Sequence, residues 1–159
     1  MKIELINGAQ TVPDSKSPLA ALINFYHAFN HQDMSEMSQN WAHSADVSMS
    51  NPLGGVKRGW HQIESVYRHI FGGPAEVYVE FYDFNLHETN DMFTAAGREK
   101  GHFRSQGNEI ELAIRTTRVY QHIDQQWKQI HHHGSIDHPE LLNNYQRAVL
   151  GKTTAQIAI

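Results

Sequence analysis

Cysteine is absent from the 159 residues of the sequence. A disulfide framework, a thiolate metal site and thiol chemistry are therefore excluded. No stretch reaches the roughly 18 consecutive apolar residues of a membrane-spanning helix. The opening residues Met1-Lys2-Ile3-Glu4 are not followed by a long apolar run, so we expect no signal peptide and a cytoplasmic location.

Positive charge is also scarce, with 13 Lys and Arg residues against 17 Asp and Glu residues and a net charge of −4. Nucleic-acid binding depends on neutralising phosphates, so we expect no nucleic-acid partner, and no membrane partner either. The remaining composition, 40% hydrophobic and 19% charged, is typical of one globular domain. Histidine is abundant, with 12 copies, and it is the side chain that titrates near neutral pH and the commonest metal ligand.

The first half of the chain has helical periodicity. Ser17 before Pro18 is a favourable helix start, and apolar residues at helical spacing predict a helix over 18–30. Asp33 and Glu36 resemble a capping box that begins a second, short helix ending near Trp41. A third helix is predicted from Trp60 to the glycines at 72 and 73.

The second half of the chain has strand periodicity. A short strand is predicted at 46–51, and longer ones at 76–88, 92–104, 109–122 and 126–136, followed by a helix at 141–150. Three helices followed by a run of hairpin-linked strands predict an α+β fold, with the helices packed on a curved, mostly antiparallel sheet. We divide the chain into an N-terminal arm (1–16), one domain (17–137) and a C-terminal helix and tail (138–159).

This order of elements over 17–137 resembles the NTF2-like superfamily, whose fold is a cystatin-like cone, and within it the SnoaL-like and ketosteroid-isomerase-like proteins. The most specific part is the last hairpin, with Arg118-Val119-Tyr120 on one strand and Trp127 to Ser135 on the other. This hairpin is also similar to the association domain of calmodulin-dependent kinase II. The resemblance implies a cone that encloses a small-molecule pocket.

The chain departs from the ketosteroid isomerases at two positions. Asn51 stands before Pro52 where that family has a general-base Asp, and Phe25 stands where it has an oxyanion-hole Tyr. An amide cannot abstract a proton, so steroid isomerisation is not expected. The association domain lines its cone with arginines that match Arg118 and Arg98 here, and two guanidinium groups would favour a carboxylate or another anion.

The last hairpin predicts a polar face beneath the helices. A turn centred on 124–125 makes Arg118 face His131, Thr116 face His133, and Tyr120 face Gln129. Polar groups on a covered face need hydrogen-bond partners or a wet pocket. The resulting candidate catalytic residues are His131, His133 and Arg118. The candidate ligand-binding residues are Tyr26, Trp60, Tyr67, Arg98, Thr116, Tyr120 and Gln129.

Other roles for these residues stay open. Arg118 could be a buried arginine paired with Glu109, Glu111 or Asp46, and the histidines could be hydrogen-bonded within the sheet. His131 and His133 share a face, but a metal site would need a further ligand such as His102 or His27. We therefore expect no metal and no organic cofactor. Apolar residues on the opposite face of the sheet (Tyr78, Tyr82, Phe84 and Leu86) indicate a homodimer.

Two functions are consistent with these residues. The first is a SnoaL-like acid–base isomerase, cyclase or dehydratase that acts on a small anionic or carbonyl-bearing compound, such as an organic acid or a hydrophobic carbonyl compound. The second is a non-catalytic, dimeric ligand-binding or assembly module. A perturbed histidine beside an open cavity would favour the enzyme, whereas a saturated arginine–carboxylate pair with no void would favour a structural role.

Overall fold

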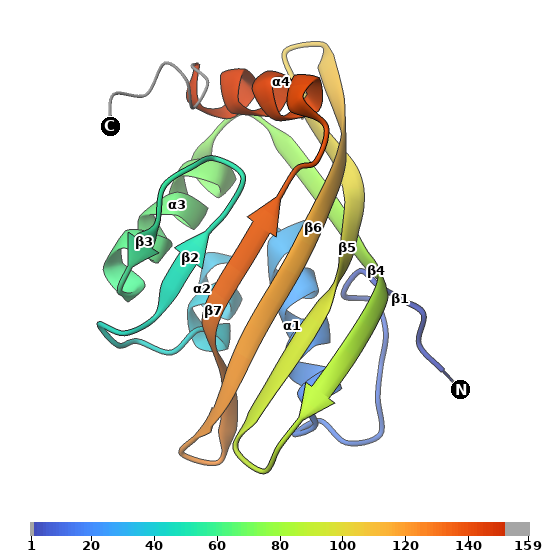
Figure 1. The fold of residues 1–159 in the computed structure, drawn as a ribbon, viewed down its shortest axis with the longest axis vertical. Coiled ribbons are helices and arrows are strands. Elements are labelled where there is room, and N and C mark those ends of the chain that lie inside the picture. The colour runs from blue at the N-terminus through green and yellow to red at the C-terminus, as the bar shows by residue number, and fades with distance from the viewer. Residues whose placement is uncertain (1, 152–159) are drawn as a thin grey trace.

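A computed structural model describes residues 2–151 of the protein (Figure 1). In chain order its elements are β1 (Leu5–Ile6), α1 (Pro18–Asn30), α2 (Met34–Asn40), β2 (Ser48–Ser50), β3 (Lys57–Arg58), α3 (Trp60–Gly72), β4 (Glu76–Glu88), β5 (Met92–Ser105), β6 (Asn108–Ile123), β7 (Gln126–Ser135) and α4 (Pro139–Leu150).

All seven of these strands form one sheet in the order β1-β4-β5-β6-β7-β2-β3. The neighbouring strands are antiparallel except β2 and β7, which run parallel. Figure 1 shows α1, α2 and α3 on one side of the strands and α4 across one end of the sheet. This is the α+β cone that the sequence predicts.

The helix starts follow from their capping residues. Ser17 Oγ accepts a hydrogen bond from the backbone N–H of Ala20 at 3.1 Å, and Pro18 is the first residue of α1. Asp33 Oδ1 accepts from the N–H of Glu36 at 2.9 Å and begins α2. The Glu36 side chain does not complete the capping box, because it pairs with His27 Nδ1 at 2.7 Å.

Two short strands have no counterpart in the sequence prediction. Leu5 and Ile6 pair with Tyr82 and Phe81, so part of the expected N-terminal arm adds an edge strand to the sheet. The other short strand, β3, pairs with β2. Two residues are too few to show a periodicity of two, which is why the sequence pattern did not indicate them.

Because of a β-bulge in β4, two of the four apolar residues that were expected on the outer face of the sheet lie on the inner face. Tyr82 pairs with Arg98 and Asn85 pairs with Ala96, so Asp83 and Phe84 both lie against Gly97. The extra residue reverses the alternation of side chains beyond it. Phe84 therefore stacks on the core residue Phe81 at 4.9 Å between ring centroids, and Leu86 also packs against the core.

Only glycine fits opposite this bulge. A Cβ at Gly97 would lie 2.6 Å from Phe84 Cβ. Gly101, further along β5, pairs regularly with Val79 and Leu112.

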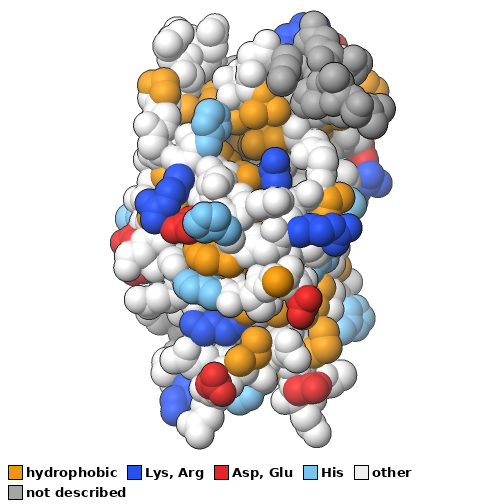
Figure 2. All heavy atoms as spheres, turned by 90° about the vertical axis from the view of Figure 1, so that its left-hand side faces the viewer, with side chains coloured by type: hydrophobic (Ala, Val, Ile, Leu, Met, Phe, Trp, Pro, Cys, Tyr) orange, Lys and Arg blue, Asp and Glu red, His pale blue; other side chains and the backbone are white. Residues whose placement is uncertain are grey.

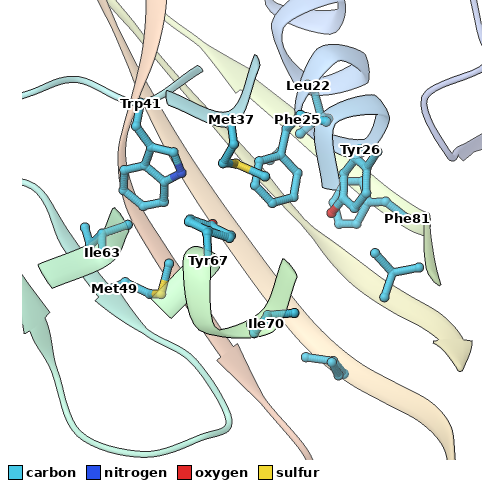
Figure 3. Close-up of a cluster of buried hydrophobic side chains, with 14 of the residues drawn as sticks. Leu22, Phe25, Tyr26, Met37, Trp41, Met49, Ile63, Tyr67, Ile70 and Phe81 are labelled. Carbon is cyan, nitrogen blue, oxygen red and sulfur yellow. The ribbon is translucent and has the colours of Figure 1, made fainter. Parts of the chain in front are cut away.

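The core lies between the sheet and the first three helices. Figure 3 shows side chains of α1, α2 and α3 meeting over the strands, with Tyr67 between Trp41 and Phe25. Its largest fully buried side chains are Trp41, Tyr26, Tyr120, Phe25 and Phe81. Trp127 is only half-buried and packs edge-on against Phe93 at 5.1 Å.

Helix α4 forms a separate layer at the end of the cone. His138 Nδ1 caps its start by accepting from the N–H of Leu141 at 3.2 Å, and Gly151 ends it in the left-handed conformation with φ of 74°. Tyr145 and Gln146 are its buried residues, and the Gln146 side-chain amide donates to the Pro52 carbonyl at 2.9 Å.

Charges of both signs are spread over the side of the molecule on which α3 and β3 lie. Figure 2 shows Lys, Arg, Asp, Glu and His side chains interspersed there with small hydrophobic patches. That side therefore carries no concentrated positive patch. Within residues 2–151, no helix has both the length and the hydropathy needed to cross a membrane.

Candidate functional site

A bulge in the last strand decides which histidines face the helices. Tyr120 pairs with Gln129 as predicted, but Val119 pairs with His131, so Ile130 is an extra residue. Arg118 then lies opposite His132, not His131, and His133 lies opposite Thr117, not Thr116. The predicted pairing was wrong by one residue beyond this point, and one residue reverses the face.

His131 and His133 therefore lie on the outer face of the sheet. His131 Nδ1 lies 2.7 Å from Ser48 Oγ, and His133 is exposed. The two rings are 6.5 Å apart. Across residues 2–151, no group of three or more His, Cys, Asp and Glu side chains is arranged to hold a metal ion.

Arg118 makes a buried ion pair with Glu99, a partner that the sequence pattern did not indicate. Arg118 Nη2 lies 2.8 Å from Glu99 Oε1, and 3% and 5% of the two side chains are exposed. The same guanidinium donates to Gln129 Oε1 at 3.0 Å and to the Tyr26 hydroxyl at 3.3 Å, and it stacks on the Phe25 ring at 3.6 Å.

Arg118 stays protonated despite its burial. Desolvation works against the charged form, but Tyr26 and Glu99 lie close enough to raise the pKa of Arg118 above its ordinary value. Tyr26 also donates to Glu99 Oε1 at 2.6 Å. Burial, together with the charge of Glu99, raises the pKa of Tyr26, so this hydroxyl stays a donor.

Arg98 does not reach the cone. It lies on the outer face, where its Nε is 3.1 Å from Asp83 Oδ2 and about two-thirds of each side chain is exposed. The next residue, Glu99, takes the inward position. Counting back from the last hairpin therefore predicted Arg98 at the inward position, one residue before Glu99, which occupies it.

Four predicted ligand-binding residues are buried between the sheet and the helices but do not line the cavity described below: Tyr26, Thr116, Tyr120 and Gln129. Tyr120 donates to Asn40 Oδ1 at 2.8 Å, and Gln129 Nε2 donates to the same oxygen at 3.2 Å. Thr116 is also buried on the inner face. Trp60 is half-buried and stacks on His43 at 4.7 Å.

That cavity, of about 50 Å³, lies between the helices and the inner face of the sheet. Its wall is mostly apolar and comes from α1, α3, β4, β6 and α4. Its polar lining residues are Asn51, Tyr67, Glu99, Arg118, His132 and Tyr145. Of the residues predicted for the site, Arg118 and Tyr67 are thus beside this cavity, and burial raises the pKa of Tyr67 to about 12.

The His132 ring lines this cavity with both of its nitrogens buried and without a hydrogen-bond partner within residues 2–151. Its side chain is 7% exposed. Burial, and after it the positive charge of Arg118, holds the pKa of His132 well below its ordinary value, so the ring is neutral at pH 7. Gly134 leaves room for the ring, since a Cβ there would lie 3.2 Å from Nε2.

Sequence reasoning missed Glu99, His132 and Tyr145 as lining residues. Strand alternation alone, read correctly on β5, would have placed Glu99 inward together with Val77 and Val79 of the neighbouring strand. His132 could not be found that way, because the bulge at Ile130 has no sequence signature. Tyr145 belongs to the predicted C-terminal helix, but nothing in the sequence placed that helix over the cone.

Comparison with known proteins gives a family and a fold. The profile of the SnoaL-like domain matches residues 19–139. No curated protein sequence matches the chain.

Several solved structures share the fold. One from Thiobacillus denitrificans, named as a candidate association domain of calcium/calmodulin-dependent protein kinase type II, is 22% identical with a TM-score of 0.65, and the match covers 78% of this chain and 98% of that one. An NTF2-like protein from Streptomyces avermitilis, named as a candidate dehydratase, is 24% identical with a TM-score of 0.64 over 73% and 90% of the two chains. A protein with a cystatin-like fold from Caulobacter vibrioides is 19% identical with a TM-score of 0.63 over 79% and 91%.

Proposed function

Because the chain belongs to the SnoaL-like domain family and has the NTF2-like fold, we propose that it binds a small molecule in the cavity beside His132. The ligand hydrogen-bonds to the His132 ring and packs against the apolar wall between α1, α3 and the sheet. A mostly apolar cavity with a few convergent polar groups is the usual form of such a site.

The observation that supports this proposal most strongly is the state of His132. A buried polar group without a partner costs about 1–3 kcal/mol, so native proteins rarely keep one without a use. A neutral imidazole carries one donor and one acceptor nitrogen. A ligand that offers an acceptor to one ring nitrogen and a donor to the other would satisfy both nitrogens of His132.

The proposed chemistry is acid–base catalysis on a carbonyl-bearing compound. His132 is neutral, so its acceptor nitrogen can take a proton from the ligand. Because burial and the charge of Arg118 disfavour the protonated ring, His132 holds that proton only transiently and returns it at a second position, as an isomerisation, a dehydration or a cyclisation requires. In this scheme His132 takes the role that the sequence pattern assigned to His131 and His133. Arg118 holds Glu99 in place, since its three nitrogens already donate to Glu99, Gln129 and Tyr26.

The saturated Arg118–Glu99 pair supports a second candidate function, a non-catalytic ligand-binding module. In that case His132 binds the ligand and transfers no proton. Half-buried Tyr78 and Tyr82 remain on the outer face of the sheet, where a second copy of the chain would cover them. Sedimentation of the wild type and of Tyr82→Glu tests that dimer: the account expects a dimer that the substitution dissociates, and a wild-type monomer contradicts it.

Nuclear magnetic resonance of the ¹⁵N-labelled histidine rings tests the site. We expect that, in a titration with a panel of small ketones and enols, some compounds shift the ring nitrogens of His132 saturably and leave those of exposed His133 in place. His132→Gln removes that binding, whereas His133→Gln retains it. Compounds that bind only elsewhere, with His132 unmoved, would contradict the proposal.

A further inference from the structure

We infer that Glu99 and Tyr145 recognise a hydrogen-bond donor on the ligand, and that the ligand is a neutral hydroxyl- or N–H-bearing compound and not an organic acid. The inference rests on the proposed function, because it concerns the same cavity. It adds two ligand-binding residues and narrows the class of ligand.

Glu99 lines the cavity and keeps one carboxylate oxygen without a hydrogen-bond partner within residues 2–151. Its Oε1 accepts from both Tyr26, at 2.6 Å, and Arg118, at 2.8 Å. Its Oε2 accepts from no group within residues 2–151. An ionised carboxylate has about four lone-pair sites, so this second oxygen can accept a donor from a ligand. Tyr26 and Arg118 fix the carboxylate, which makes the acceptor pre-organised.

Tyr145 brings a second polar group from α4. Its ring is 7% exposed, packs edge-on against Phe103 at 6.0 Å and lines the same cavity as Glu99. No residue within 2–151 hydrogen-bonds to its hydroxyl. Burial, and then the negative charge of Glu99, raises the pKa of Tyr145, so the hydroxyl stays protonated and can both donate and accept. Helix α4 is therefore part of the site as well as its cover.

The charges around the cavity exclude an anion as the preferred ligand. Arg118 and Glu99 cancel, His132 is neutral, and the remaining lining residues carry no charge. A buried anion needs a paired cation, and Arg118, the one cation that residues 2–151 contribute to the cavity wall, is already paired. A carboxylate would also face the free oxygen of Glu99, which repels it. A neutral donor gains a hydrogen bond to a charged acceptor instead, and such bonds are about twice as strong as neutral ones.

Three probes that share one aromatic ring separate these classes: phenol is neutral and donates, toluene is apolar without a donor, and benzoate is an anion. A ring exceeds the cavity volume of about 50 Å³, so binding of these probes requires the cavity to widen. Titration of the full chain, followed through the His132 ring nitrogens, measures all three affinities. We expect phenol to bind at least about tenfold more tightly than toluene or benzoate.

Variants then test which residues cause the tighter binding of phenol. Tyr145→Phe keeps the ring, and we expect it to reduce the preference of phenol over toluene severalfold while leaving toluene affinity unchanged. Tyr82→Phe removes a hydroxyl on the outer face and is the matched control, with affinities equal to the wild type. Glu99→Gln, where it folds, abolishes the preference.

The outcomes separate the two proposals. Benzoate binding more tightly than phenol, or a preference that Tyr145→Phe leaves intact, overturns this inference but keeps a small-molecule site at His132. Failure of all three probes to shift His132 overturns the inference and the proposed function together.

Discussion

The guanidinium of Arg118 donates to the carboxylate of Glu99 across 2.8 Å, inside the cone and almost out of contact with solvent. The pair has two consequences. It uses the arginine that the sequence assigned to an anionic ligand, and it leaves the cavity with no net charge. In the proposed site, the polar contacts to a ligand therefore come from His132, the free oxygen of Glu99 and Tyr145.

Breaking the ion pair destabilises the fold. Arg118→Ala leaves Glu99 buried without its cation, which costs about 3–5 kcal/mol. Urea denaturation measures this change in the free energy of unfolding. The double variant Arg118→Leu with Glu99→Leu is the matched control and should recover most of the loss, because two apolar residues replace the pair. A single variant as stable as the wild type would show that the pair is not formed.

His132 makes stability depend on pH. Its pKa is lowered in the folded protein by burial and by the charge of Arg118, with smaller contributions from His131 and His133. Below an unfolded-state pKa of about 6.5, His132 binds a proton in the unfolded chain but not in the folded chain. The free energy of unfolding therefore falls as the pH falls. We expect this histidine to remove about 1 kcal/mol of stability between pH 6.5 and 5.5.

Chemical denaturation at several pH values tests the assignment. His132→Gln should flatten the pH profile by that amount, and the lowered pKa of His131 accounts for part of the slope that remains. His133→Gln should change the profile much less, because the charge of His133 makes only a small contribution to the lowered pKa of His132. Equal slopes for the wild type and His132→Gln would contradict a buried neutral ring.

Two tryptophans should differ in their contribution to stability. Trp41 is 1% exposed, so Trp41→Ala leaves a cavity and costs about 3–5 kcal/mol. Trp127 is half-buried at the hairpin, so Trp127→Ala costs less, about 1–2 kcal/mol. Thermal unfolding of both variants compares the two losses of stability. A larger loss for Trp127→Ala would contradict the deeper burial of Trp41.

Gly97 is required by the bulge in β4. Gly97→Ala places a Cβ 2.6 Å from Phe84 Cβ, and this overpacking costs about 1–3 kcal/mol. Gly72→Ala is the matched control, because a Cβ at the end of α3 meets no atom within 4 Å. Thermal unfolding should show a loss for the first variant and none for the second. Tolerance of alanine at position 97 would mean that the strands pair without this bulge.

The sequence predicted the fold well because long periodic segments carry strong signals. The bounds of α1 and β4 and the turns before β6 and β7 agree with the structure, since caps and turn residues mark them locally. The inward-facing residues of β5 and β7 were predicted less well, because each of them depends on strand register. Because of the bulge at Ile130, His132 faces the helices, whereas the sequence predicted that His131 and His133 would. On β5 the count was wrong by one residue, so Arg98 was expected at the inward position that Glu99 occupies.

The central claim is that the cone holds a small molecule between His132, Glu99 and Tyr145. A high-resolution crystal structure of protein purified from cells without added ligand tests it most directly. We expect density of a neutral compound with a polar group within hydrogen-bonding distance of a His132 ring nitrogen. A closed cone in which the His132 ring bonds to protein atoms, leaving no space beside the Arg118–Glu99 pair, would contradict it.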